Sequence, residues 1–176
     1  SLTDVNLPEG ARTETIGAYA FYNTKLANII LREGLVDIGT YAFANTALTS
    51  VSIPKSVKHI REYAFNIASL TDVTFTNGSA VTDELYIYNY AFASAPIASI
   101  ILPAQLKSLG EHDEGYNYQT VDYVFNGNLT LHTIEVNPEN TIYTSFDGVL
   151  CLYGATTEEL ILSYCPRAKT GTLYVP

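Results

Sequence analysis

The densest group of side chains capable of chemistry lies in the stretch "LGEHDEGYNYQTVDY", from Leu109 to Tyr123. A histidine among carboxylates could ligate a metal ion, whereas tyrosine rings beside acceptor oxygens could recognise a protein or a glycan. Consecutive residues such as His112, Asp113 and Glu114 seldom point at one centre, and calcium loops use alternating ligands around a central glycine. Three interpretations of this exposed loop are open: a tolerated surface loop, a recognition patch for a protein or glycan, and a metal site at His112. The residues expected to carry recognition are Glu111, His112, Asp113, Tyr116 and Tyr118.

The rest of the chain does not indicate catalysis. The histidines His59, His112 and His132 fall in different parts of the sequence, and no nucleophile elbow, zinc-protease motif or phosphate-binding loop is present. The acidic pair Glu158 and Glu159 stands in an expected hairpin turn, where solvated charge is the default. The sequence thus predicts a protein that is not an enzyme and that has no catalytic residue, no metal ion and no cofactor.

The charge of the chain restricts its partners. Its 176 residues carry 18 acidic and 9 basic side chains, a formal net charge of −9. Nucleic acids and anionic membranes attract clustered Lys and Arg, so neither is an expected partner. No apolar run approaches the roughly 18–20 residues of a membrane-spanning helix, so no direct membrane insertion is expected. The chain starts in full repeat pattern without Met, and we expect it to be an excised or processed fragment.

The two cysteines, Cys151 and Cys165, are too few for a disulfide-built scaffold, and their spacing is not that of a metal knuckle. We expect free or buried thiols, with a bridge, a zinc site and a reactive thiol as alternatives. The stretches "GVLCLYG" and "ELILSYC" predict a β-hairpin. Pairing Tyr153 with Leu160 would place Cys151 opposite Leu162, a register that argues against a bridge.

The elements that must position these side chains repeat along the chain. The words "IGAYAF", "IGTYAF", "IREYAF" and "IYNYAF" and the echo "VDYVF" each end at a phenylalanine. These residues, Phe21, Phe43, Phe65, Phe92 and Phe125, lie 22, 22, 27 and 33 residues apart. Each word predicts a single helical or 3₁₀ turn with its Phe pointing inward. One such unit cannot bury its own apolar face, so neighbouring units must stack into a solenoid with a column of Phe residues. An aromatic binding strip is the alternative function of these words.

A strand template, L-x-x-V/I-x-L/I, precedes each aromatic word. In "LTSVSIP" the alternation of Val51 and Ile53 with Ser50 and Ser52 predicts a short strand with one exposed face. The outward positions of successive strands form two rows in which small polar side chains dominate. The first row is Asp4, Asn28, Ser50, Asp72, Ser99 and Thr133, and the second is Asn6, Ile30, Ser52, Thr74, Ile101 and Glu135. A partner-binding face and a merely solvated face are both open, and the candidate binding residues are Asn28, Ser50 and Asp72.

The unit "LTSVSIPKSVKHIREYAF" resembles, nearly position by position, the BspA-like leucine-rich repeat "LxxVxIPxxVxxIGxxAF". The tail "FDGVLCLYGATTEELILSYCPRAKTGTLYVP" is similar to the non-repeat hairpin of that family. The resemblance covers essentially the whole chain. It implies an α/β repeat solenoid, a leucine-rich-repeat fold with short parallel strands, short helical or 3₁₀ turns and a C-terminal β-hairpin.

We expect one domain spanning residues 1–176. Its repeats fall at about 2–24, 25–46, 47–68, 69–95, 96–128 and 129–148, with a tail hairpin at about 149–165 and the start of a further repeat at about 172–176.

Members of the resembled family are mostly surface or secreted proteins associated with adhesion. The resemblance therefore implies a non-catalytic binding module at the cell surface or outside the cell, with a protein or glycan of a host or neighbouring cell as its partner. The alternative is a structural spacer that projects other domains from the surface and has no ligand of its own. The sequence carries no signal for an oligomeric state.

Overall fold

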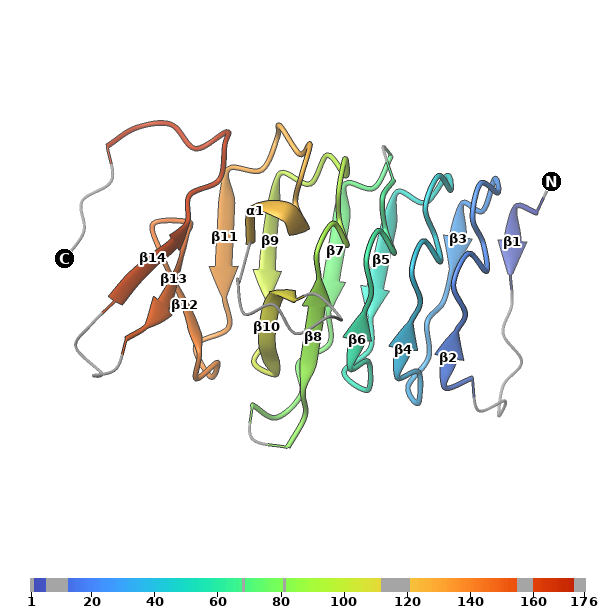
Figure 1. Cartoon of the computed structure of the whole chain (residues 1–176), viewed down its shortest axis with the longest axis horizontal. Coiled ribbons are helices and arrows are strands. Elements are labelled where there is room, and N and C mark those ends of the chain that lie inside the picture. Colours follow the sequence, from blue (N-terminus) through green and yellow to red (C-terminus); the bar gives the residue numbers. More distant parts are fainter. Residues whose placement is uncertain are drawn as a thin grey trace.

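The chain winds into a solenoid whose coils stack along one long axis, with an antiparallel hairpin at the C-terminal end (Figure 1). This computed structural model describes residues 2–5, 13–67, 69–80, 82–111, 121–154 and 160–172. Parallel strands dominate, and the described part contains almost no helix beyond α1 (Val121–Val124). The repeat solenoid with parallel strands and a C-terminal hairpin, as predicted from the sequence, is confirmed.

The predicted strand template forms one long side of the solenoid, which we call the odd-strand side. In β5 the alternation of polar and apolar residues matches the alternation of exposed and buried side chains. Ser50 and Ser52 are exposed, while Val51 and Ile53 are buried. Backbone hydrogen bonds join the strands of this side only in pairs, which gives three two-stranded parallel sheets, β1–β3, β5–β7 and β9–β11. The strands are β1 (Asp4–Val5), β3 (Asn28–Ile29), β5 (Ser50–Ile53), β7 (Asp72–Phe75), β9 (Ser99–Leu102) and β11 (Thr133–Val136).

A second strand in each coil, just before the aromatic word, forms the other long side, which we call the even-strand sheet. Here the strands pair continuously in the order β10-β8-β6-β4-β2. Isoleucines such as Ile38 and Ile60 face each other across the pairing and are fully buried, which explains why this apolar position recurs. The strands are β2 (Thr15–Ile16), β4 (Asp37–Ile38), β6 (His59–Ile60), β8 (Leu85–Tyr88) and β10 (Leu106–Glu111).

The Tyr-Ala-Phe words form hydrogen-bonded turns instead of a regular helical turn. The amide of Ala42 donates to the carbonyl of Gly39 at 3.0 Å, which closes a four-residue β-turn. The third residue of this turn, Tyr41, has a left-handed φ of 57°, and Tyr63 has the same φ at the same position of the next turn. Non-glycine residues seldom occupy this region, and it prevents a helix from continuing. Bonds between coils hold the conformation in place, because the amide of Tyr41 donates to the carbonyl of Glu62 at 3.1 Å.

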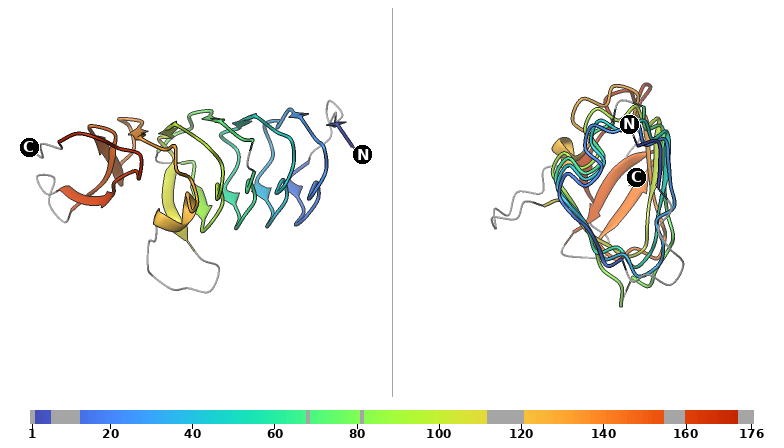
Figure 2. Two further views of the ribbon diagram at one scale, coloured as in Figure 1. Left: turned by 90° about the horizontal axis from the view of Figure 1, so that it is seen from above. Right: turned by 90° about the vertical axis from the view of Figure 1, so that its right-hand side faces the viewer.

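The phenylalanines of the words form the predicted column through the core. The ring centroids of Phe43 and Phe65 lie 5.1 Å apart with an interplanar angle of 9°, and both side chains are fully buried. Viewed from the end, the coils superimpose, so equivalent residues stack from coil to coil (Figure 2). The column continues through Phe92 to Phe125, where Tyr164 of the tail hairpin lies 6.4 Å from the Phe125 ring. The hairpin thereby covers the end of the column.

Buried amide side chains join the longer coils, where the repeat pattern lapses. Asn140 is 4% exposed. The two N–H groups of its Nδ2 are shared among three carbonyls of the preceding coil at 3.0–3.1 Å, and its Oδ1 accepts from two amides of its own coil at 2.7 and 2.9 Å. Asn128 makes equivalent bonds one coil earlier, since its Nδ2 donates to the carbonyl of Ile97 and its Oδ1 accepts from the amides of Thr130 and Leu131. Gln105 accepts from the amide of Gly78 and donates to the carbonyl of Thr76. Sequence analysis did not identify these residues.

The tail is an antiparallel sheet of β12 (Tyr143–Phe146), β13 (Val149–Tyr153) and β14 (Leu160–Tyr164). The predicted register is confirmed, since Tyr153 pairs with Leu160 and Cys151 with Leu162. Both cysteines are free, with Cys151 buried and Cys165 exposed. Burial raises the pKa of the Cys151 thiol, which disfavours the reactive thiolate. The repeat boundaries stay predictions, and residues 173–176 of the expected further repeat lie outside the described residues.

Candidate functional site

The predicted exposed face is present on the odd-strand side. In the second row, Ile30 and Ile101 are 66% and 65% exposed. The first row has the predicted register: Asp4 faces Asn28, Ser50 faces Asp72, and Ser99 faces Thr133. Parallel sheets usually have both faces covered by other elements. An exposed parallel face of this length is a surface on which a solenoid can bind a partner.

The structure places Asn28, Ser50 and Asp72 on this face but brings only two of them together. Ser50 and Asp72 lie directly opposite each other in β5 and β7. Asn28 instead contacts Asp4, with its Nδ2 donating to Oδ1 at 3.4 Å. Among the residues described, the Asp72 side chain has no hydrogen-bond or ion-pair partner, so its carboxylate is available to a ligand. A binding role for these three residues stays a prediction.

The predicted recognition loop begins and ends on the other long side of the molecule. Glu111 is the last residue of β10, and Tyr123 lies in α1. His112, Asp113, Tyr116 and Tyr118 lie outside the described residues, as does the side chain of Glu111. Because β10 belongs to the even-strand sheet and Asp72 to the odd-strand side, the described ends of the loop and the exposed rows lie on different sides (Figure 2).

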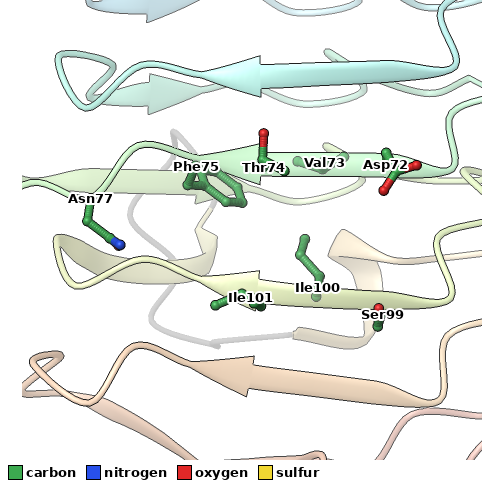
Figure 3. A pocket seen from close by; sticks show the side chains of 8 residues that line it. All are labelled: Asp72, Val73, Thr74, Phe75, Asn77, Ser99, Ile100 and Ile101. Carbon is green, nitrogen blue, oxygen red and sulfur yellow. The ribbon is translucent and has the colours of Figure 1, made fainter.

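A groove of about 300 Å³ opens between β7 and β9, where backbone hydrogen bonding on the odd-strand side is interrupted (Figure 3). We call it the β7–β9 groove. Asp72 and Ser99 lie at one end of the groove, and Phe75 and Asn77 lie at the other. Ile101 lies between these ends on β9. The groove therefore combines a carboxylate and a hydroxyl with apolar surface, which is the composition of a specific binding site.

Pro96 changes the hydrogen bonding between the two coils that flank this groove. At the equivalent position of two earlier coils, the amide of Ala47 and the hydroxyl of Ser69 each donate to a carbonyl of the preceding coil, at 2.9 and 2.8 Å. Pro96 has neither an amide hydrogen nor a hydroxyl, so this bond is lost. One coil later the Nδ2 of Asn128 restores such a contact by donating to the carbonyl of Ile97 at 3.0 Å. The odd-strand side is also interrupted between β3 and β5, although Ala47 makes this bond there, so Pro96 alone does not account for the position of the groove.

A second feature that sequence analysis missed is a column of tyrosines on the surface beside the Phe column. Tyr41 and Tyr63 stack at 4.6 Å with an interplanar angle of 4°, and Tyr63 and Tyr90 stack at 4.7 Å. The end members, Tyr19 and Tyr123, are 55% and 43% exposed. The inward Phe residues are core, as predicted, and the alternative of an aromatic binding strip stays a prediction. The ring faces of the tyrosines cover one another, so this column offers ring edges and hydroxyl groups to a partner.

The tyrosine column predicts a loss of stability at alkaline pH. Burial first, and then the neighbouring phenols, raise the pKa of Tyr41 and Tyr63 above the usual value of about 10. The folded state therefore holds these protons more tightly than the unfolded state does. The resulting stabilisation is complete below about pH 10 and is lost as the pH rises through the raised pKa values. Thermal melts should show a steeper fall of Tm above pH 10 in the wild type than in the double variant Tyr41→Phe, Tyr63→Phe; parallel slopes would contradict this assignment.

The even-strand sheet carries a polar cluster that belongs to its packing. Arg61 Nη2 lies 2.7 Å from Asp37 Oδ2, and the guanidinium carbon lies 5.5 Å from the centre of the Tyr88 ring. The Tyr88 hydroxyl is 3.2 Å from Nδ1 of His59, which is half-buried in β6. Each of these groups has a partner within the cluster, so the cluster joins β4, β6 and β8.

Within the described ranges, no group of three or more His, Cys, Asp or Glu side chains is placed to hold a metal ion. The alternative of a metal site at His112 falls on a residue outside those ranges. No helix in the described part is both long and apolar enough to cross a membrane.

Comparison with known proteins gives one family and several similar folds. A family model described as "BspA type Leucine rich repeat region" matches residues 1–113 in six copies. No curated protein matches the chain. The crystal structure of the pneumococcal vaccine antigen PcpA is similar, with a TM-score of 0.69 and 25% identity over 88% of this chain and 35% of that protein.

Two further crystal structures share the fold at lower identity. A leucine rich cell surface protein from Faecalibacterium prausnitzii has a TM-score of 0.58 and 22% identity, over 93% of this chain and 46% of that protein. A leucine-rich repeat protein from Eubacterium ventriosum has a TM-score of 0.50 and 22% identity, over 84% of this chain and 40% of that protein. The chain thus spans less than half the length of each of these solved proteins.

Proposed function

The chain belongs to the BspA-type leucine-rich repeat family, and from this premise we propose that it is a non-catalytic binding module of the cell surface or extracellular space. Leucine-rich repeat proteins of this type are typically not enzymes. The surface location is supported by the Faecalibacterium protein of the same fold, which is described as a cell surface protein.

The observation that carries this proposal is the exposed odd-strand side with its open β7–β9 groove. Small polar side chains such as Ser50 and Ser99 can form hydrogen bonds with a partner, and exposed Ile30 and Ile101 can form apolar contacts. The partner class is a protein or glycan of a host or neighbouring cell, and the activity is adhesion. Loop 109–123 is proposed as a further contact region.

A structural spacer remains the second candidate, and a specific observation favours it. The coils are joined by stacked aromatic columns and by backbone bonds along the whole even-strand sheet, which makes an elongated body without any ligand. The two functions differ in one measurable respect, because a binder depends on particular exposed side chains and a spacer does not.

We expect the purified chain to bind a member of a panel of extracellular-matrix proteins, mucins and glycans at physiological salt, with and without calcium. Surface plasmon resonance would compare the wild type with a face variant (Asn28→Ala, Ser50→Ala, Asp72→Asn) and a loop variant (Asp113→Ala, Tyr116→Ala, Tyr118→Ala). Loss of central contacts typically costs about 2 kcal/mol or more, which is roughly a thirtyfold loss of affinity.

A control variant carries Glu14→Ala and Thr15→Ala, two exposed positions at the start of the even-strand sheet. It should bind like the wild type. Loss of binding in the face variant supports the odd-strand side as the site, and loss in the loop variant alone moves the site to loop 109–123. Absence of binding by a protein whose circular dichroism shows it to be folded would contradict the proposal and favour the spacer.

A further inference from the structure

We propose that the β7–β9 groove receives a lysine or arginine side chain of a protein partner, with the cation placed at Asp72. This inference rests on the proposed binding function and names the chemistry of the partner at the same surface. It is carried by the charge of the face, the shape of the groove and the unpaired edges of its two strands.

The negative charge of the exposed rows favours a cationic ligand over an anionic one. The two exposed rows of the odd-strand side contain the carboxylates of Asp4, Asp72 and Glu135 and no Lys or Arg. Asp4 accepts a hydrogen bond from Asn28, and Glu135 accepts one from the hydroxyl of Ser145 at 2.9 Å. Asp72 is left without a partner among the residues described. A cation in the groove would therefore gain a charge-assisted hydrogen bond that the protein itself does not form.

The volume of the β7–β9 groove fits a single long side chain. A volume of about 300 Å³ is at the lower end of the range of roughly 300–1,000 Å³ for ligand pockets. It holds one long side chain but not a helix. Lys and Arg have an aliphatic stem that packs on apolar surface while the charged end reaches a polar partner. Ile101, which is 65% exposed, and half-buried Phe75 supply that surface.

The interruption in the sheet adds hydrogen-bond acceptors. Among the residues described, no backbone hydrogen bond joins β7 to β9, so amide and carbonyl groups along their facing edges have no partner in the opposite strand, and the carbonyls can accept from a cation. Lysine and arginine offer three and five N–H donors and no acceptor, which suits a site of carboxylate, hydroxyl and carbonyl oxygens. The Asp72 carboxylate would repel an anionic ligand, and the half-buried Phe75 ring offers little ring face on which a sugar could stack.

The test uses the whole chain, labelled with ¹⁵N, and a capped pentapeptide with arginine at its centre and glycine elsewhere. A matched peptide carries citrulline, which replaces the guanidinium by a neutral urea of nearly the same shape. NMR titration should show saturable shifts at the amides of β7 and β9 with the arginine peptide and none with the citrulline peptide. Asp72→Asn should weaken binding about tenfold or more, because it removes the charged acceptor. Asp4→Asn, which makes the same change of charge on the same row, should leave the affinity unchanged.

Shifts from the citrulline peptide equal to those from arginine, or an Asp72→Asn protein that binds as tightly as the wild type, would overturn the proposal. So would saturable shifts at these amides with chitotriose and none with the arginine peptide. Failure of this inference is distinguishable from failure of the proposed function. A panel partner still bound by Asp72→Asn overturns only the cation site, whereas a folded wild type that binds neither peptide nor panel overturns both.

Discussion

Replacement of Phe65 by alanine is expected to lower the free energy of unfolding by about 3–5 kcal/mol. The Phe65 ring is fully buried and is stacked between Phe43 at 5.1 Å and Phe92 at 5.6 Å. Its removal leaves a cavity in the column, and because each coil contacts only its neighbours, no distant element can fill that cavity. Urea unfolding followed by circular dichroism, or by the fluorescence of the 14 tyrosines in this Trp-free chain, would measure the loss.

The matched control is Phe21→Ala, at the N-terminal end of the same column. Phe21 is only partly buried and has one stacked neighbour, Phe43 at 5.2 Å. It should therefore lose clearly less stability than Phe65→Ala. Equal losses at the two positions, or an unchanged midpoint for Phe65→Ala, would refute the assignment of this column as the core of the solenoid.

Asn140→Ala is expected to destabilise the C-terminal part of the solenoid by about 3 kcal/mol or more, since it leaves several buried backbone groups without a partner. The three carbonyls that the Asn140 amide group satisfies belong to the segment between Pro103 and Leu106, so one side chain joins two successive coils. Proteolysis should begin in this part of the variant, because local opening exposes the chain there. Urea unfolding combined with limited proteolysis would measure both effects.

Asn137→Ala is the control for this residue type and region. Its side-chain oxygen accepts one hydrogen bond, from the amide of Glu139 at 2.9 Å, at a partly exposed position. The loss should be about 1 kcal/mol or less. If Asn140→Ala were no more harmful than Asn137→Ala, the buried amide would not be the link between these coils.

Periodicity made much of the fold predictable. Alternation in stretches such as "SVSI" determines which side chains of β5 face outward, and β7 repeats the same pattern, so the facing of Ser50 and Asp72 follows from the sequence. The Phe column follows from the recurrence of one word. The left-handed backbone at Tyr41 cannot be predicted from the sequence in this way. The conformational preference of a tyrosine disfavours this φ, and hydrogen bonds with the next coil impose it.

The candidate site was predictable only in part. The rows of outward residues were found because facing is a property of each strand alone. The β7–β9 groove depends on which neighbouring strands pair, and this is a property of two coils together that the pattern of a single strand does not contain. Asn140 was missed for a related reason, since its partners lie more than thirty residues away in the sequence.

The unequal hydrogen bonding of the two long sides affects how the molecule can bend. The even-strand sheet is continuous from β2 to β10, whereas the odd-strand side is divided into three pairs of strands. The side formed by the even-strand sheet should therefore resist bending, whereas the odd-strand side can bend where neighbouring strands are not hydrogen-bonded. Its curvature can change at the joint between β7 and β9 without breaking a backbone hydrogen bond between those strands. A partner that fills the joint between β7 and β9 would fix the curvature at that joint, and a pulling force that opens this joint would release the partner.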